Sequence, residues 1–194
     1  MIGIFSINNY EYDIAILGGY CINLANVSLY DTLGEEAVEH INNQAELQVV
    51  FVQNVAKMQM LLNIKTPDLK TIVVMENCEI PATGRDDIAA ISFAAFMESG
   101  GTDELKVIPP SADDIATLNY TSGTTGLPKG VMLTHRALMT TGVGIGKYMM
   151  SGVPLRPSDV WFSYLPLAHI FERAAHVTFM CFGSKWAYSG GKYK

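Results

Sequence analysis

Short apolar runs alternate with helical patterns along the chain, and this alternation restricts the fold more than any other feature. Runs typical of buried strands lie at Ile2 to Ser6, Leu24 to Tyr30, Leu47 to Val52, Thr71 to Met75 and Ile115 to Tyr120. Helical patterns lie at Tyr10 to Leu24, after Gly34, at Val55 to Leu62 and at Ile88 to Met97. Strands that alternate with helices of this length predict an α/β fold with a mostly parallel sheet covered on both faces.

Three local patterns add detail to this outline. The apolar residues of the first predicted helix, at spacings of three, four and three, are Ile14, Leu17, Cys21 and Leu24. Residues 98–114, with the sequence ESGGTDELKVIPPSADD, interrupt both periodicities and are typical of a surface linker. Beyond the next strand, Val131 to Thr134 is a short extended run, and Thr134 is expected to cap a helix that begins HRALMTT.

The composition excludes several classes of protein. Of the 194 residues, 49% are hydrophobic and 16% are charged, which is enough apolar material for one large domain or part of one. A net charge of −6 without a long run of either sign indicates neither a nucleic acid nor a membrane surface as partner. Cys21, Cys78 and Cys181 lie too far apart for a disulfide framework or a zinc ribbon, so a reducing, intracellular compartment fits best. We expect neither a signal peptide nor a membrane span.

The segment YTSGTTGLPKG, Tyr120 to Gly130, is the strongest candidate for a functional site. It is not the nucleoside-triphosphate loop GxxxxGK[ST]: counted from Gly123, Lys129 is in register, but Pro128 replaces the second glycine and Gly130 replaces the hydroxyl residue. The hydroxyl residues that could wrap an anion, with Lys129 as a nearby cation, are Thr121, Ser122, Thr124 and Thr125. Phosphate is the expected ligand. A mobile Ser/Gly linker is the alternative, and the two strand-like flanks disfavour it.

The same segment also carries a family resemblance. YTSGTTGLPKGVMLTHRAL resembles the phosphate-loop signature of the adenylate-forming superfamily, which includes acyl-CoA synthetases, luciferases and peptide-synthetase adenylation domains. VSLYDTLGEEAVEHINNQAE (Val27 to Glu46) and YLPLAHIFER (Tyr164 to Arg173) are similar to long-chain fatty acyl-CoA synthetases. The resemblance implies part of the large N-terminal domain of the adenylate-forming fold, with mostly parallel sheets flanked by helices.

The resemblance implies a reaction in two steps. A long-chain fatty carboxylate attacks the α-phosphate of ATP to give acyl-AMP and pyrophosphate, and the thiol of coenzyme A then displaces AMP. The implied cofactors and cosubstrates are ATP, Mg²⁺ and coenzyme A, and a loop rich in donors would stabilise the charge of the departing pyrophosphate. The nucleotide site implied by the match consists of Thr121, Ser122, Gly123, Thr124, Thr125, Gly126 and Lys129. Lys129 is also a catalytic candidate.

A second candidate lies in YLPLAHIFER and the residues after it. His169, Glu172 and His176 fall at i, i+3 and i+7, so on a helix they share one face. A metal site is disfavoured because only His169 and Glu172 lie within one turn and Arg173 opposes a cation. The alternatives are a solvated or core-facing helix patch, and the family role in which this segment lines the acyl and pantetheine channel. In the family role, His169 is the second catalytic candidate. No residue is assigned to a metal ion.

Other aromatic and histidine residues receive simpler interpretations. The aromatic residues expected in the core are Trp161, Phe162 and Tyr164. His40 and His135 are expected at the surface or at helix caps.

Relatives in the resembled family are longer than this chain. They carry a glutamate that holds Mg²⁺, an aspartate that binds ribose, and a small C-terminal domain that supplies a lysine. We therefore expect residues 1–194 to be a fragment of the N-terminal AMP-binding domain, without the C-terminal domain and with little or no activity alone. The alternatives are a non-catalytic nucleotide-binding remnant and another adenylate-forming carboxylate ligase. The family suggests the cytosolic face of the endoplasmic reticulum, the mitochondrial outer membrane or the peroxisome.

Overall fold

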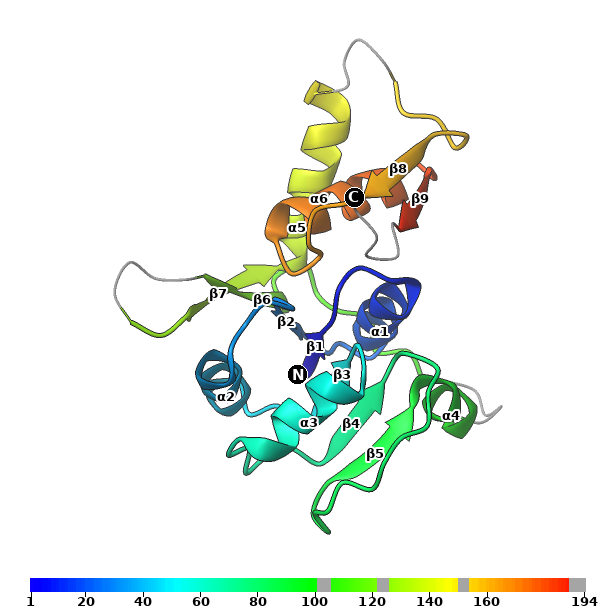
Figure 1. Cartoon of the computed structure of the whole chain (residues 1–194). Coiled ribbons are helices and arrows are strands. Elements are labelled where there is room, and N and C mark those ends of the chain that lie inside the picture. Colours follow the sequence, from blue (N-terminus) through cyan, green and yellow to red (C-terminus); the bar gives the residue numbers. More distant parts are fainter. Residues whose placement is uncertain (101–105, 122–125, 150–153, 189–194) are drawn as a thin grey trace.

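A seven-stranded sheet with helices on both faces dominates the computed structural model, which describes residues 1–100, 106–121, 126–149 and 154–188 (Figure 1). The strands of this sheet are β1 (Ile2–Phe5), β2 (Asn26–Leu29), β3 (Val49–Val52), β4 (Thr71–Val74), β5 (Ala89–Ser92), β6 (Ile115–Thr121) and β7 (Lys129–Thr134). The helices connected to its first strands are α1 (Tyr10–Cys21), α2 (Glu35–Gln44), α3 (Val55–Asn63) and α4 (Phe93–Ser99).

The strand order explains where a ligand would bind. The order is β5-β4-β3-β1-β2-β6-β7, and each neighbouring pair is parallel except β6 and β7, which are antiparallel. The chain moves from β1 to β2 on one side and then returns to β3 on the other side. In sheets of this kind, ligands bind beyond the carboxyl ends of the strands. The expected mostly parallel α/β sheet is confirmed.

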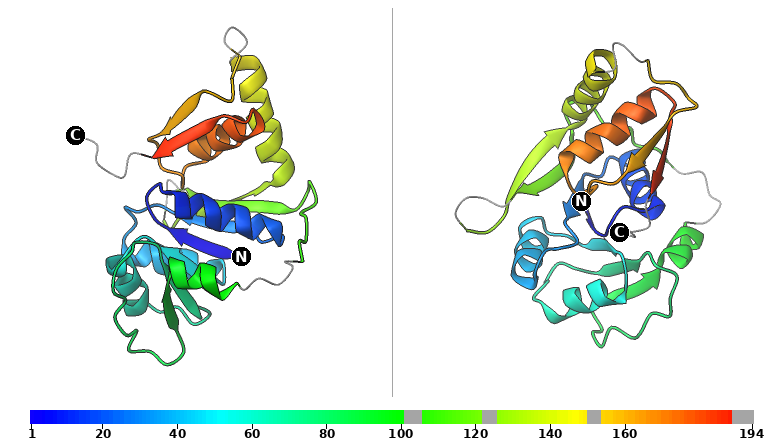
Figure 2. Two further views of the ribbon diagram at one scale, coloured as in Figure 1. Left: turned by 90° about the vertical axis from the view of Figure 1, so that its right-hand side faces the viewer. Right: turned by 45° about the horizontal axis from the view of Figure 1, so that its top comes forward.

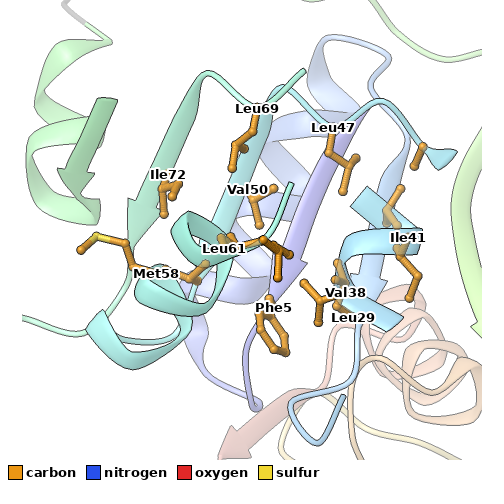
Figure 3. Packing of buried hydrophobic residues seen from close by; sticks show 14 of the residues in the cluster. Phe5, Leu29, Val38, Ile41, Leu47, Val50, Met58, Leu61, Leu69 and Ile72 are labelled. Atoms are coloured by element: carbon orange, nitrogen blue, oxygen red, sulfur yellow. The ribbon is translucent and has the colours of Figure 1, made fainter. Parts of the chain in front are cut away.

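Alternating side chains of β1, β3 and β4 face two separate cores. On β3, Val50 and Val52 belong to a cluster that includes residues of α2 and α3, whereas Phe51 belongs to a second cluster with residues of α1 and α4. Figure 3 shows the first cluster, in which the strands meet α2 and α3 through Val38, Ile41, Met58 and Leu61. Full burial on both faces accounts for the nearly continuous apolar strand runs.

The C-terminal part of the chain forms a second unit on the α1 side of the large sheet (Figure 2). It consists of α5 (His135–Gly144), which continues into a π-helical turn η1 (Ile145–Met149), then β8 (Val160–Ser163), α6 (Ile170–Cys181) and β9 (Lys185–Tyr188). β8 and β9 form a parallel pair. Thr134 caps α5 as expected, because its hydroxyl accepts from Ala137 N at 3.2 Å. No helix in the described part of the chain is long and apolar enough to cross a membrane.

The prediction for the first helix was wrong about its face and its end. Ile14 and Leu17 are 39% and 38% exposed, Cys21 is exposed, and the helix stops at Cys21, before Leu24. The residues that α1 buries are Tyr12, Ala15, Ile16 and Gly19. Apolar residues occur on nearly every side of YEYDIAILGGYC, so two stripes satisfy the helical spacing and the sequence alone favours neither.

The prediction of one helix from Ile88 to Met97 was wrong in its first half. Ala89–Ser92 is strand β5, and Ser92 then caps α4 by accepting from Ala95 N at 3.1 Å. The alanines favour a helix locally, but the edge of β4 offers a parallel partner, and tertiary pairing overrides the local propensity. Within the predicted linker, residues 98–99 end α4, and residues 106–114 lie outside helices and strands.

Candidate functional site

The β6–β7 hairpin carries the candidate phosphate loop. Thr121, the last residue of β6, pairs with Lys129, the first residue of β7, and both are exposed. The loop residues Ser122, Gly123, Thr124 and Thr125 lie outside the described residues. Gly126 has a φ of 99°, a backbone conformation that favours glycine. Strand β6 pairs with β2 on one side and with the edge strand β7 on the other, so the packed sheet fixes the base of the loop.

Packing against Tyr120 explains why residue 130, which is also part of the motif, is a glycine. A Cβ atom at Gly130 would lie 3.0 Å from Cζ of Tyr120, so the tyrosine ring covers the backbone of the opposite strand. The hydroxyl of Tyr120 donates to Oε1 of Gln44 on α2 at 2.9 Å. Burial raises the pKa of Tyr120, which keeps it a neutral donor. The hairpin is therefore attached to α2 through this ring.

A cleft of about 440 Å³ lies beyond the carboxyl ends of β2 and β6. Its lining residues are Tyr30, Thr32, Leu33, Ile41, Tyr120, Thr121, Pro128 and His169. Two of the residues singled out in the sequence, Thr121 and His169, therefore line one space although 48 positions separate them in the sequence (169 − 121). Gly126 and Lys129 are not among the lining residues of this cleft.

His169 occupies the N-cap position of α6. Its Nδ1 accepts from the Phe171 N–H at 3.1 Å, so a neutral ring carries its proton on Nε2. The neighbouring Ala168 carbonyl accepts from Asn119 Nδ2 at 2.9 Å. Asn119 lies on β6, two residues before Thr121, so this hydrogen bond links the position of His169 to the base of the loop.

Arg173, the last residue of YLPLAHIFER, has a structural role that the sequence patterns did not indicate. It is 3% exposed, and its guanidinium donates to Oδ1 of Asn26 at 2.8 Å and to the hydroxyl of Ser28, both on β2. It also donates to the Leu167 carbonyl at 3.2 Å. A buried guanidinium needs such partners because its charge is costly to desolvate. The polar Asn26 and Ser28 within an apolar strand run were the available signal.

Glu172 and His176 belong to a buried network rather than to the cleft. His176 Nδ1 lies 3.3 Å from Asp13 of α1, and its Nε2 lies 2.9 Å from the Ser163 hydroxyl and 3.5 Å from Oε1 of Glu172. Trp161 donates to Glu172 at 2.8 Å. These contacts match the core-facing helix patch, and His169 does not take part in them.

Charges in this network shift the pKa values of both groups. Burial lowers the pKa of His176, but Asp13 and Glu172 outweigh it, so the pKa is raised. Burial raises the pKa of Glu172, but the hydrogen bonds from His176 and Trp161 outweigh it, so the pKa is lowered. His176 is therefore favoured as a cation between two carboxylates. Within the described residues, the structure gathers no group of three or more His, Cys, Asp or Glu side chains that could hold a metal ion.

An apolar cavity of about 130 Å³ lies on the other side of α6. Its lining residues are Ile145, Leu155, Trp161, Phe171, Ala175, Thr178 and Phe179. The Thr178 hydroxyl donates to the carbonyls of Gly142 and Ala174, at 3.0 and 2.8 Å.

The prediction that Phe162 and Tyr164 lie in the core was wrong, because they are 51% and 54% exposed. Phe162 lies on β8, which pairs with β9 in a two-stranded sheet, and Tyr164 directly follows this strand.

Sequence comparison connects this chain with known enzymes. Residues 1–192 match the family described as AMP-binding enzyme. The chain is 39% identical to long-chain-fatty-acid–CoA ligase 1 of Homo sapiens, over 98% of this chain and 28% of the ligase. It is 36% identical to long-chain acyl-CoA synthetase 6, peroxisomal, of Arabidopsis thaliana, over 94% of this chain and 26% of the synthetase. The chain therefore spans between a quarter and a third of the length of these relatives.

Solved structures share the fold at lower identity. The anthranilate CoA ligase AuaEII in complex with anthranoyl-AMP superimposes with a TM-score of 0.83 at 23% identity, covering 98% of this chain and 35% of that one. Apo MatB from Rhodopseudomonas palustris gives a TM-score of 0.77 at 20% identity, covering 100% of this chain and 35% of that one. These similarities identify the fold as that of the adenylate-forming N-terminal domain. Since the family match covers almost every residue and the sheet has the same architecture, the chain belongs to the AMP-binding enzyme family.

Proposed function

We propose that this chain takes part in the ATP-dependent activation of long-chain fatty acids to acyl-CoA, through an acyl-AMP intermediate. The observation that carries the proposal is the cleft beyond β2 and β6, where Thr121 at the base of the loop and His169 line the same space. The names of the relatives at 36–39% identity support the choice of a long-chain fatty acid as the substrate.

In this proposal the loop grips the phosphates of ATP. The nucleotide site comprises Thr121, Ser122, Gly123, Thr124, Thr125, Gly126 and Lys129. Hydroxyl and N–H donors of the loop, with the ammonium of Lys129, would stabilise the negative charge that develops on departing pyrophosphate. Lys129 suits this role because it is exposed and stands opposite Thr121 at the base of the loop.

His169 has a different role in the proposal. The Nε2–H of a neutral His169 ring is available as a donor at the edge of the cleft, where the carboxylate must approach the α-phosphate. The segment after it, α6, borders the apolar cavity, whose lining suits methylene groups better than polar groups, although its volume of about 130 Å³ holds only part of a long chain. Coenzyme A is the proposed thiol acceptor.

Mg²⁺ fits the described residues poorly. Carboxylates are the protein ligands that bind Mg²⁺ best, and in the part of the chain that the structure describes none of them lines the cleft. The described lining of the cleft therefore does not supply a Mg²⁺ site. The intracellular location and the domain assignment, an AMP-binding N-terminal domain over residues 1–194, stay predictions.

Calorimetric titration with ATP and with pyrophosphate tests the nucleotide site. We expect Lys129→Ala to weaken pyrophosphate binding at least tenfold, because a charge-assisted contact contributes about 1.5–3 kcal/mol. The matched control is Lys185→Ala, which removes an exposed lysine at the first residue of β9, outside the cleft. Equal affinities for the Lys129→Ala variant and the wild type would remove Lys129 from the site.

Isotope exchange between ATP and pyrophosphate tests the reaction. Because residues 1–194 are expected to have little or no activity alone, we expect at most weak exchange with the purified chain. Any exchange should depend on a long-chain fatty acid, exceed the exchange with anthranilate, and disappear in Lys129→Ala. Robust exchange would contradict the expected inactivity of the fragment, and binding of ATP with no exchange at all would favour a non-catalytic nucleotide-binding remnant. Faster exchange with anthranilate would favour another carboxylate ligase of the family.

A further inference from the structure

Helix α2 contacts both strands of the hairpin at the base of the phosphate loop. His40 Nε2 lies 3.0 Å from the Pro128 carbonyl oxygen on the β7 side. One turn later on the same helix, Gln44 Oε1 accepts from the Tyr120 hydroxyl on the β6 side at 2.9 Å. In sequence, Tyr120 directly precedes Thr121 and Pro128 directly precedes Lys129. The two hydrogen bonds therefore bracket the loop at both of its ends.

The chemistry of these contacts fixes donor and acceptor. A carbonyl oxygen only accepts, so His40 must carry a proton on Nε2 and donate it to Pro128. The Pro128 carbonyl and the Lys129 N–H belong to one planar peptide unit, so holding the oxygen also orients that N–H group. The Tyr120 ring, which packs over Gly130, transmits the second contact to the opposite strand.

Helix α2 is rigid enough to serve as an anchor. Its inner face is fixed by Val38 and Ile41, which are fully buried in the core with Leu29 of β2. The strand it supports lies at an edge of the sheet, where β7 pairs with β6, and its residues from Lys129 to Met132 are exposed. Figure 1 shows the hairpin extending away from the sheet on the side where α2 lies.

We propose that His40 and Gln44 are positioning residues, which hold the two strands of the β6–β7 hairpin so that Thr121 and Lys129, at its base, are placed to contact the phosphates of ATP. This inference rests on the proposed function, and it adds two residues outside the loop motif to the nucleotide site. His40 was expected only at the surface or at a cap. The spacing of residues within one helix could not indicate that the partner of His40 is Pro128, 88 residues away.

Pyrophosphate binding to the purified chain, measured by calorimetry, tests the proposal. His40→Leu removes the donor, and we expect pyrophosphate affinity to fall about fivefold, as for the loss of one net hydrogen bond. His40→Gln keeps an N–H donor at a similar reach and should restore affinity to within about twofold of the wild type. Gln44→Leu and Tyr120→Phe remove the same hydrogen bond from opposite sides, so their effects should not add.

A matched control comes from the same helix. Asn43 donates to the Lys65 carbonyl at 2.8 Å, so Asn43→Leu also removes a bond from an α2 side chain to a main-chain oxygen, away from the hairpin. We expect this variant to keep wild-type affinity for pyrophosphate. If Asn43→Leu weakened binding as much as His40→Leu, the effect would be a general loosening of α2 and the proposal would be wrong.

Hydrogen exchange separates this inference from the proposed function. In His40→Leu, but not in Asn43→Leu, we expect faster amide exchange in peptides that cover residues 118–134, with or without pyrophosphate. Unchanged exchange and unchanged affinity in His40→Leu would overturn the positioning role while wild-type binding kept the proposed function. Failure of the wild type to bind pyrophosphate would overturn the proposed function, and with it the role in presenting the loop.

Discussion

Replacing His176 with glutamine removes the cation from the buried network between α1 and α6. Glu172 is fully buried and would keep Trp161 as a donor, and Asp13 would keep contacts with Tyr188 and Trp186. Breaking a buried ion pair by removing one partner costs about 3–5 kcal/mol. Because both carboxylates retain a donor, we expect the lower value, about 3 kcal/mol of unfolding free energy at pH 6.

The two tryptophans of the chain report on this network directly. Trp161 donates to Glu172, and the Trp186 ring centroid lies 5.1 Å from that of His176. Urea unfolding followed by tryptophan fluorescence is therefore a suitable assay. With a slope of about 2 kcal/mol per molar urea, a loss of about 3 kcal/mol lowers the midpoint by about 1.5 M.

The same variant has a pH signature with a defined sign. The folded-state pKa of His176 is raised above the unfolded value of about 6.5, so its stabilisation is fully present below pH 6.5 and is lost as the pH rises through the folded value. The urea midpoint of the wild type should therefore decrease as the pH is raised above 6.5, because His176 loses up to about 1.4 kcal/mol of stabilisation per pH unit. His176→Gln should lack this contribution.

Another histidine makes the comparison between variants necessary. Burial lowers the pKa of His135, so its contribution to stability is lost as the pH falls, the opposite direction to that of His176. The difference between wild type and His176→Gln cancels this background. A loss below about 1 kcal/mol with an unchanged pH slope would refute the claim that His176 is a charged cross-link.

Further predictions concern the packing and capping of α5. Thr134→Ala removes the N-cap hydrogen bond and should lower the unfolding free energy by about 1 kcal/mol, measured by urea denaturation. Gly142→Ala should cost about 1–3 kcal/mol, because the new Cβ would lie 2.6 Å from Cγ1 of Val177 on α6. Gly144→Ala, where nothing lies within 4 Å of the new Cβ, should be neutral or slightly stabilising. Thermal melts compare the two variants, and equal melting temperatures for Gly142→Ala and Gly144→Ala would contradict the close approach of α5 and α6.

Short-range patterns were sufficient to predict most of the sheet. The runs IGIF, VVFV and IVV (Ile72–Val74) are apolar at every position because both faces of a parallel sheet are covered, and each lies in a strand. The errors occurred where a partner distant in sequence decides. Ala89–Ser92 forms a strand because the edge of β4 offers a pairing partner. Helix α1 buries Tyr12 rather than Ile14 because the rest of the protein packs against the face that carries Tyr12.

The residues of the candidate site also differ in whether a local sequence motif or only a long-range contact identifies their role. The loop and His169 carry recognisable local motifs, so a single sequence indicated them. Arg173 and His176 also fall in the patterns noted in the sequence, but those patterns did not indicate their partners, Asn26 and Asp13. His40 lies 88 residues from its partner Pro128, and no local motif links them. Only folding brings such pairs together.

These long-range contacts determine how the site keeps its shape. His169 is exposed at the start of α6, and a residue at a helix end would move freely if the helix were loosely packed. One turn later, Arg173 is held by β2, and just before His169 the Ala168 carbonyl is held by Asn119 of β6. The same strand β6 ends in Thr121, so a sliding movement of α6 would break buried hydrogen bonds before it separated His169 from the loop base. The buried charges of α6 do not line the cleft, but they stabilise it because they hold His169 at a fixed position relative to Thr121.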